Sequence, residues 1–243
     1  MAVPALQRTA GRQFGVSRRA RLQELRYLTF GRAVPAALFG LLGYRVLAGL
    51  VAQVQSLPKS AGPLDWAAGP LPTAMYFLFC VIPVWIYLTR PMPAARDGRL
   101  LPRLAGFTGT TMLLVVGAFP VPVLFLPPLA VRTAATPLTI AAFALALYGL
   151  LHLRRNLSII PEARRLVTTG PYRVIRHPLY AAEIIVAFGA VLTRPALWPT
   201  AMLLPFVAVQ MLRAHYEERL LRATFPEYSA YALSSARIIP GVY

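Results

Sequence analysis

The sequence predicts an all-α integral membrane protein, a polytopic bundle of four transmembrane helices followed by a C-terminal helical hairpin. Three observations predict this fold. The 243 residues are 57% hydrophobic and only 14% charged, whereas a soluble domain carries about a quarter charged residues. The apolar residues gather in runs about as long as a membrane-spanning helix requires. The basic residues, which give a formal net charge of +17, fall mainly between alternate pairs of these runs.

Four apolar runs approach the roughly 20 residues that a helix needs to cross the hydrocarbon layer. They cover residues 33–54, 72–88, 104–126 and 138–153. A fifth apolar region, 179–212, is broken at Thr193-Arg194-Pro195 into halves of roughly 15–17 residues, short for two full spans. We therefore expect a tight helical hairpin that dips through most of the bilayer. The prolines at 120, 122, 127 and 128 predict a kinked end of the third run.

The arginines orient these helices. They are frequent in residues 1–32, after the second and fourth runs, and after the hairpin, whereas the alternate connections hold one basic residue each: Lys59, Arg132 and Arg194. The inside-positive rule then predicts that both termini are cytoplasmic. This topology accounts for the positive charge, so we expect no nucleic-acid partner.

The chain divides into three parts on these grounds. They are an Arg-rich cytoplasmic segment (1–32), the transmembrane helices (33–153), and a catalytic region (154–243) that contains the hairpin 179–212. A cleaved presequence is the alternative for the first part, because it is nearly free of acidic residues.

The chemistry is expected in two polar cytoplasmic stretches, 156–180 and 213–243. In the first, Pro178 suits the first position of a helix whose N-terminal amides attract a carboxylate or phosphate. In the second, Arg213 and Glu217 lie four residues apart and share a helix face, with Glu218 beside them; an ordinary surface ion pair is the alternative. The three histidines are scattered, so we expect no metal site. With no nucleophile motif either, a bound cofactor is expected to supply the reactive group.

These residues form a pattern that resembles the isoprenylcysteine carboxyl methyltransferases and the related phospholipid methyltransferases. Their pattern is L-V-x-x-G-x-Y-x-x-x-R-H-P-x-Y, then a hairpin, then E-E-x-x-L-x-x-x-F-G-x-x-Y-x-x-Y. The matching residues are Leu166, Val167, Gly170, Tyr172, Arg176, His177, Pro178 and Tyr180, followed by Glu217, Glu218, Leu221, Phe225, Tyr228 and Tyr231. The chain departs from the pattern at Ala182 and Pro226, where the family favours glycine.

The resemblance implies methyl transfer from S-adenosyl-L-methionine to a lipophilic acceptor in the membrane. The family's cofactor contacts carry over to Arg164, Arg165, Leu166, Val167, Tyr172, His177, Pro178, Leu179, Tyr180 and Glu217. Arg213 corresponds to the arginine that faces the acceptor, and Glu218 is the candidate base if the acceptor is an amine. Glu183 lies within an apolar helix near this site and is predicted to line the acceptor's path, because charges at membrane depth usually mark a pathway.

Two other functions remain open. The segment Arg237-Ile238-Ile239-Pro240 also resembles the C-terminal end of sterol reductases, which use NADPH, and a lipid-binding module without catalytic activity would keep the same pocket. The Arg/Ala/Pro-rich composition suggests a bacterial inner membrane, with the active site facing the cytoplasm. We therefore expect a lipid or isoprenoid acceptor rather than a prenylated protein.

Overall fold

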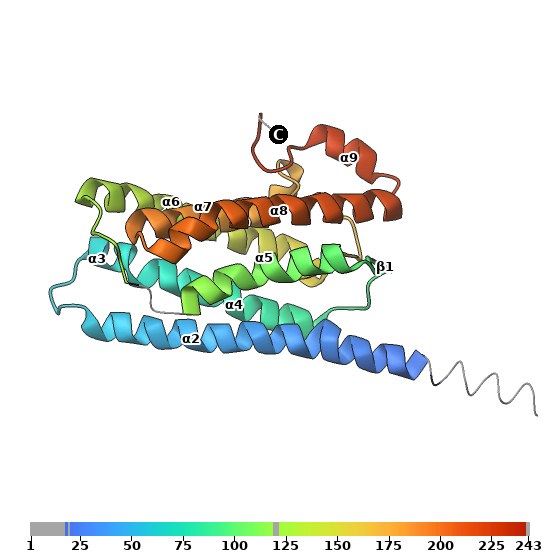
Figure 1. The fold of residues 1–243 in the computed structure, drawn as a ribbon, viewed down its shortest axis with the longest axis horizontal. Helices are drawn as coiled ribbons and strands as arrows, with labels where there is room; N and C mark the ends of the chain where they lie inside the picture. The colour runs from blue at the N-terminus through green and yellow to red at the C-terminus, as the bar shows by residue number, and fades with distance from the viewer. Residues whose placement is uncertain (1–17, 19, 119–121, 242–243) are drawn as a thin grey trace, which may run out of the picture.

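The computed structural model describes residues 18, 20–118 and 122–241, and its helices run side by side along one long axis (Figure 1). Most of the Arg-rich segment 1–32 and the tip of the expected third run, with Pro120, lie outside the described residues. The elements in chain order are η1 (Tyr27–Ala33), α2 (Val34–Ser56), α3 (Pro63–Ala68), α4 (Pro70–Thr89), β1 (Ala95–Arg96), α5 (Leu100–Ala118), α6 (Leu129–Leu153), η2 (Arg154–Asn156), β2 (Glu162–Ala163), η3 (Gly170–Arg173), α7 (Pro178–Thr193), α8 (Leu197–Thr224) and α9 (Tyr228–Ser234).

Four of the described helices are long and apolar enough to cross a membrane, which confirms the predicted fold class. They are the continuous helix Ala20–Ser56, α4, the helix Leu129–Asn156, and α8. The expected run 104–126 corresponds to α5, which ends at Ala118 and is not among the four. The second half of the expected hairpin is α8, which continues past residue 212 to Thr224 and buries Arg213, Tyr216 and Glu218 in its polar part.

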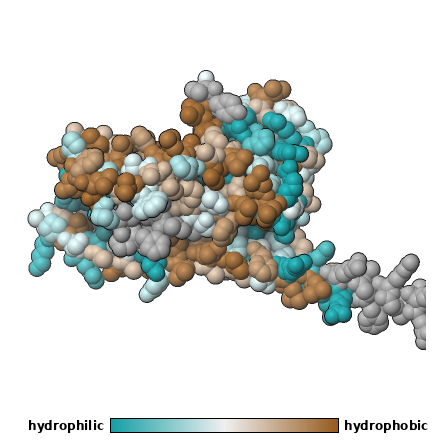
Figure 2. Space-filling model, in the orientation of Figure 1, coloured by the Kyte–Doolittle hydropathy of each residue, from teal (hydrophilic) through white to brown (hydrophobic). Residues whose placement is uncertain are grey.

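Helix pairs build the bundle. Helix α2 packs on α4, α6 packs on α4 and α7, and α8 packs on α5 and α7. One core cluster joins α6 to α7 through Ala146, Leu150, Leu179 and Ala182, small and large side chains in alternation. Large apolar side chains such as Trp85 and Leu204 are exposed on the outside. Figure 2 shows this apolar surface over the sides of the bundle, as a lipid environment favours.

The two ends of the bundle differ in polarity. One end carries β1, η3 and α9, and Figure 2 shows most of the hydrophilic surface there. We call it the arginine-rich end, because Arg96, Arg99, Arg164, Arg176 and Arg237 belong to its strands and connections. The opposite end carries α3 and the turn between α7 and α8.

A buried ion cluster ties together the connections at the arginine-rich end. Strands β1 and β2 pair antiparallel, with Arg96 opposite Glu162. The Glu162 carboxylate lies 2.7 Å from Arg96, 2.7 Å from Arg164 and 3.5 Å from Arg90. Arg90 also donates hydrogen bonds to the carbonyls of Leu157 and Gly31. The cluster therefore joins the first helix, α4 and the connection after α6.

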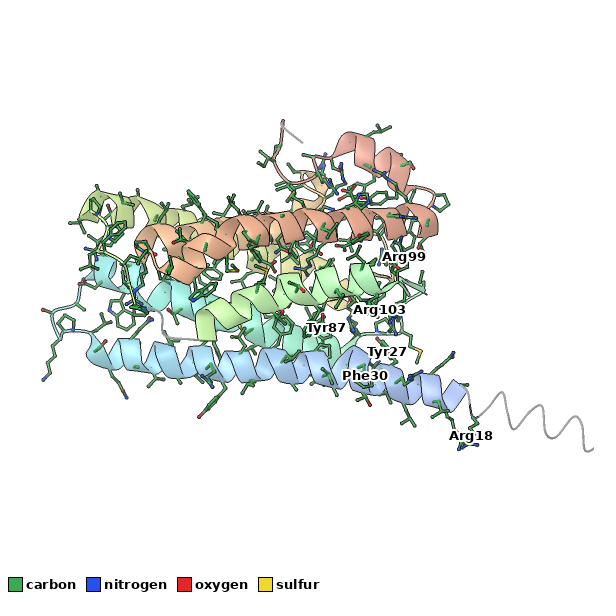
Figure 3. All side chains as sticks on the ribbon, in the orientation of Figure 1. Arg18, Tyr27, Phe30, Tyr87, Arg99 and Arg103 are labelled. Carbon is green, nitrogen blue, oxygen red and sulfur yellow. The ribbon has the colours of Figure 1, made fainter. Side chains whose placement is uncertain are left out.

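Aromatic side chains complete this junction. The Arg90 guanidinium lies 4.2 Å from the ring centroid of Tyr87, and the Tyr27 hydroxyl donates a hydrogen bond to the carbonyl of Pro91. Figure 3 shows Tyr27, Arg99 and Arg103 toward this end of the bundle, with Tyr87 farther from that end. Burial raises the pKa of the Glu162 carboxyl, but its attraction to Arg164 and Arg90 outweighs burial and holds the pKa below the ordinary 4.5.

Candidate active site

The candidate site forms where the start of α7 meets the polar end of α8. His177 caps α7 in a non-helical conformation, and Pro178 occupies the first helical position, as the sequence predicts. The segment before α7 is held by a bridge between Ile175 and Ala236 and by hydrogen bonds from the Arg176 and His177 amides to the carbonyls of Ala236 and Arg237. The C-terminal segment therefore fixes the direction in which α7 starts.

Tyr180 is the centre of the site. Its hydroxyl donates a hydrogen bond of 2.8 Å to the Glu217 carboxylate. The His177 imidazole stacks on the Tyr180 ring with centroids 5.2 Å apart, and the Arg213 guanidinium lies 4.6 Å from the same ring. His177 Nδ1 is also 3.8 Å from Glu217. Four of the residues expected from the sequence are thus brought into contact.

A narrow pocket borders this group. It is lined by Tyr180, Arg213, Glu217, Gly106 and residues 158–161, and its volume of about 10 Å³ is room for about one water molecule. A Cβ at Gly106 would lie 2.3 Å from the carbonyl oxygen of Ile159, so only glycine lets α5 approach this connection. The pocket places a phenol, a guanidinium and a carboxylate around one small volume.

A second polar group lies deeper in the bundle beside Arg213. Gln210, which is fully buried, donates a hydrogen bond to Glu183 and accepts one of 2.7 Å from Arg213. Glu183 lies 3.7 Å from the same guanidinium. The structure therefore brings Glu183 beside Arg213 through a glutamine that the sequence analysis missed. The sequence offers one signal for Gln210: its side-chain amide stands alone in an apolar helix, three residues before Arg213.

Glu218 faces away from this pocket into a cluster of cations. Its carboxylate lies 3.0 Å from Arg176, 3.1 Å from His177 Nε2, 3.4 Å from Arg237 and 3.6 Å from Arg222. Arg176 in addition donates hydrogen bonds to the carbonyls of Ala232 and Ser235. Glu218 thus ties α8 to the start of α7 and to the C-terminal segment, and it is saturated with donors.

The expected cofactor residues between 164 and 172 fall into different surroundings. Arg164 is committed to Glu162 and to the carbonyl of Pro91, and Arg165 is exposed. Leu166 and Val167 are half-buried, whereas Tyr172 is buried. Burial, with the nearby Glu217 carboxylate, raises the pKa of Tyr172 well above its ordinary value, so its hydroxyl stays protonated. Leu179 belongs to the core between α6 and α7.

The turn that carries Tyr172 depends on Gly170. Its φ of +61° lies in the left-handed region, and a Cβ there would sit 2.3 Å from the His152 ring. The Tyr231 hydroxyl, from α9, donates a hydrogen bond of 2.6 Å to the carbonyl of Tyr172. Among the described residues, no group of three His, Cys, Asp or Glu side chains is arranged to hold a metal ion.

The segment that builds this site is similar to a known protein family. Residues 131–228 match the phospholipid methyltransferase family. This match confirms the resemblance inferred from the two motifs. The methyltransferase-family region covers α6, α7 and α8, the helices that carry Tyr180, Glu183, Arg213 and Glu217. Together with the four apolar helices, it indicates a membrane protein with a region similar to this family.

Two curated relatives align with part of the chain. The cobalt-zinc-cadmium resistance protein CzcN of Cupriavidus metallidurans is 36% identical over 76 residues, which are 31% of this chain and 35% of that protein. The nickel-cobalt-cadmium resistance protein NccN of Alcaligenes xylosoxydans xylosoxydans is 38% identical over 84 residues, 32% of this chain and 38% of that protein. The chain thus spans less than two fifths of the length of these relatives.

Proposed function

We propose that the chain is an S-adenosylmethionine-dependent methyltransferase that acts on a lipophilic acceptor at the arginine-rich end of the bundle. The observation that carries this proposal is the meeting of Tyr180 from α7 with Arg213 and Glu217 from α8 in one pocket. Tyr180 and Glu217 belong to the two motifs of the methyltransferase-family region, which are far apart in the sequence, and Arg213 lies four residues before the second motif.

The residues present fit the proposed cofactor. Glu217 is a carboxylate about a third exposed that accepts one hydrogen bond among the described residues, from Tyr180, so it retains capacity for an ammonium group. The first-turn amides of α7 lack helical partners and suit a carboxylate. Leu166, Val167 and Tyr172 offer apolar and aromatic surface for an adenosine. The cofactor, when bound, supplies an electrophilic methyl group on a sulfonium.

Arg213 is the residue that we assign to the acceptor. Its side chain is buried, and its Nε has no hydrogen-bond partner among the described residues. A buried donor without a partner is costly, and an acceptor oxygen would satisfy it. Glu183 and Gln210 hold the other side of the guanidinium, so Arg213 keeps a fixed orientation.

The surroundings of Glu218 favour an acceptor that needs no base. We predict from the sequence that Glu218 is the base for an amine acceptor, yet three arginines and His177 surround its carboxylate. A carboxylate so held is a weak proton acceptor. An anionic oxygen attacks without losing a proton, so we propose O-methylation with Arg213 holding the oxygen. Glu218 then acts as an anchor for the site.

A bacterial inner membrane, with the arginine-rich end facing the cytoplasm, is part of the proposal. It is supported by the inside-positive rule, because the end that carries the site is also the end with most of the arginines. The cofactor would then be reached from the cytoplasm and the acceptor from the bilayer.

Ligand-dependent thermal stability tests the cofactor assignment. S-adenosylhomocysteine should stabilise the purified protein in detergent, and Glu217→Gln should weaken its binding about tenfold to a hundredfold. The matched control is Glu227→Gln, an exposed carboxylate outside the site, which should bind like the unchanged chain. Stabilisation by NADPH instead would favour the reductase alternative, and stabilisation by neither would favour a lipid-binding module.

Transfer of a labelled methyl group tests the acceptor assignment. Incubation with a bacterial lipid extract should give a labelled lipid whose methyl group is released by mild alkali, as a methyl ester is. Arg213→Lys keeps the charge but loses the planar guanidinium, so it should reduce turnover more than cofactor binding. An equal loss of both would mean that Arg213 only supports Glu217, and an alkali-stable label would rule out a carboxylate oxygen as the acceptor.

A further inference from the structure

A cavity lies away from the candidate site, toward the opposite end of the bundle. Its volume is about 710 Å³, within the range of roughly 300–1,000 Å³ that small-molecule sites occupy. Helices α4, α6, α7 and α8 supply most of its walls, which are largely apolar with a scatter of threonines such as Thr136 and Thr139.

The cavity extends far along the bundle. Along α6 its lining runs from Leu129 to Phe143, about 21 Å of helix. That is roughly two thirds of the ~30 Å hydrocarbon layer. The Tyr76 and Phe143 rings, with centroids 5.7 Å apart, close the inner end with Phe206. A molecule with an apolar chain fits this shape better than a polar metabolite.

The mouth of the cavity is positively charged. Arg132 and Arg194 both line it and both are exposed, so the cavity opens beside them. Neither makes an ion pair within the described ranges. The carboxylate of this end, Asp65, accepts a hydrogen bond of 2.8 Å from the Gly62 amide and caps α3.

The position of these arginines needs an explanation. Connections at this end hold Lys59, Arg132 and Arg194 as their basic residues, and two of these three line the same cavity. The inside-positive bias works against basic residues on the side remote from the arginine-rich end. Two unpaired guanidiniums at the mouth of an apolar cavity complement one class of ligand, an amphiphile with an anionic head.

We propose that this cavity binds a membrane lipid with an anionic headgroup. The headgroup lies between Arg132 and Arg194, and one hydrocarbon chain extends between α6, α7 and α8 to the floor formed by Tyr76 and Phe143. The site is separate from the methyl-transfer pocket: Val186 and Phe206 line the cavity, whereas Glu183 and Gln210, one turn away on the same helices, form the polar group beside Arg213.

Lipid-dependent thermal stability tests the proposal on the full chain. Delipidated protein in detergent is titrated with phosphatidylglycerol, with phosphatidylcholine of identical chains, and with inorganic phosphate. Phosphatidylglycerol alone should raise the unfolding temperature. Equal stabilisation by both lipids would overturn the headgroup assignment, and stabilisation by inorganic phosphate would mean an anion site without a lipid.

Matched variants locate the site. Arg132→Gln with Arg194→Gln should weaken phosphatidylglycerol binding about tenfold or more, whereas Lys59→Gln, which removes the same charge at the same end but outside the cavity, should not. Ala187→Phe fills the cavity from α7 and should abolish the effect with both arginines present. If the double variant does not fold, the two single variants are compared with Lys59→Gln; unchanged binding in all of them overturns the proposal. Because the readout is stability, it does not depend on methyltransferase activity.

Discussion

Replacing Glu218 by glutamine tests whether this residue is an anchor or a catalytic base. The substitution keeps the size of the side chain and removes its charge. It leaves Arg176, His177 and Arg237, whose side chains are 5–12% exposed, facing an uncharged amide. Removing one partner of a buried ion pair costs about 3–5 kcal/mol. Arg222 adds little, because it is 56% exposed.

The expected effect on thermal unfolding is large. A destabilisation of about 1 kcal/mol lowers the unfolding temperature of a protein of this size by roughly 2–4 °C, so Glu218→Gln should lower it by roughly 6–20 °C. Measurements at one fixed scan rate in detergent compare the variants, because unfolding of a membrane protein is often irreversible.

The neighbouring residue is the matched control. Glu217 is 35% exposed and accepts a hydrogen bond from Tyr180, so Glu217→Gln should lower the free energy of unfolding by less than about 1 kcal/mol. It should nevertheless lose cofactor binding, the reverse of the pattern at Glu218. If the Glu218→Gln protein keeps its stability but has no turnover, Glu218 is not a structural anchor, and the result supports its role as the catalytic base. In a double-mutant cycle with Arg176→Gln, the two losses should be strongly non-additive.

The remaining predictions concern stability and accessibility. Because the pKa of Glu162 is lower in the folded chain than its ordinary 4.5, its contribution to stability is complete above that pH and is lost as the pH falls through the folded pKa. Glu162→Gln should therefore make the unfolding temperature depend less on acid pH. An unchanged dependence would mean that other carboxyls cause it. Gly170→Ala should destabilise by about 2–4 kcal/mol, from left-handed strain and overlap with His152. Gly241→Ala, also at positive φ but with open space around it, should lower the free energy of unfolding by about 1 kcal/mol or less. If the two substitutions destabilise the protein equally, the overlap with His152 does not contribute. Cys80, which is completely buried, should react with a maleimide only as fast as the protein unfolds, and rapid labelling of the native protein would contradict its burial.

Hydropathy located most of the helices because each carries enough apolar length within one local segment. It misplaced the end of α8, since the residues after 212 are polar and were separated from the hairpin. They continue the same helix because their polar side chains, Arg213 and Glu217, face other protein groups in the site rather than water. A polar stretch at the end of an apolar helix is therefore ambiguous without its partners.

Long-range pairing explains what the sequence analysis missed. The arginines after the second apolar run predict topology, yet one of them, Arg90, is only 2% exposed. It donates a hydrogen bond to the carbonyl of Leu157, which lies 67 positions later in the chain. Gln210 and Glu183 are 27 positions apart and lie on different helices. No local periodicity encodes such pairs. The spacing of Arg213 and Glu217 on one helix face indicates Glu217 without a family comparison, whereas Tyr180 is indicated only by the resemblance to a known family.

The buried cluster around Glu162 limits how this protein can be divided. The matched region, 131–228, holds Glu162 and Arg164, but Arg90 and Arg96 come from the connection between α4 and α5. One residue that lines the pocket beside Tyr180 also comes from outside this region, since Gly106 belongs to α5. A graft of residues 131–228 onto another membrane scaffold would carry a buried carboxylate without two of its counter-charges, and a pocket without the helix that Gly106 brings against residue 159. Exchange between relatives should therefore transfer residues 90–109 together with that region, and two fragments of this chain should recover a working site only when they are expressed together.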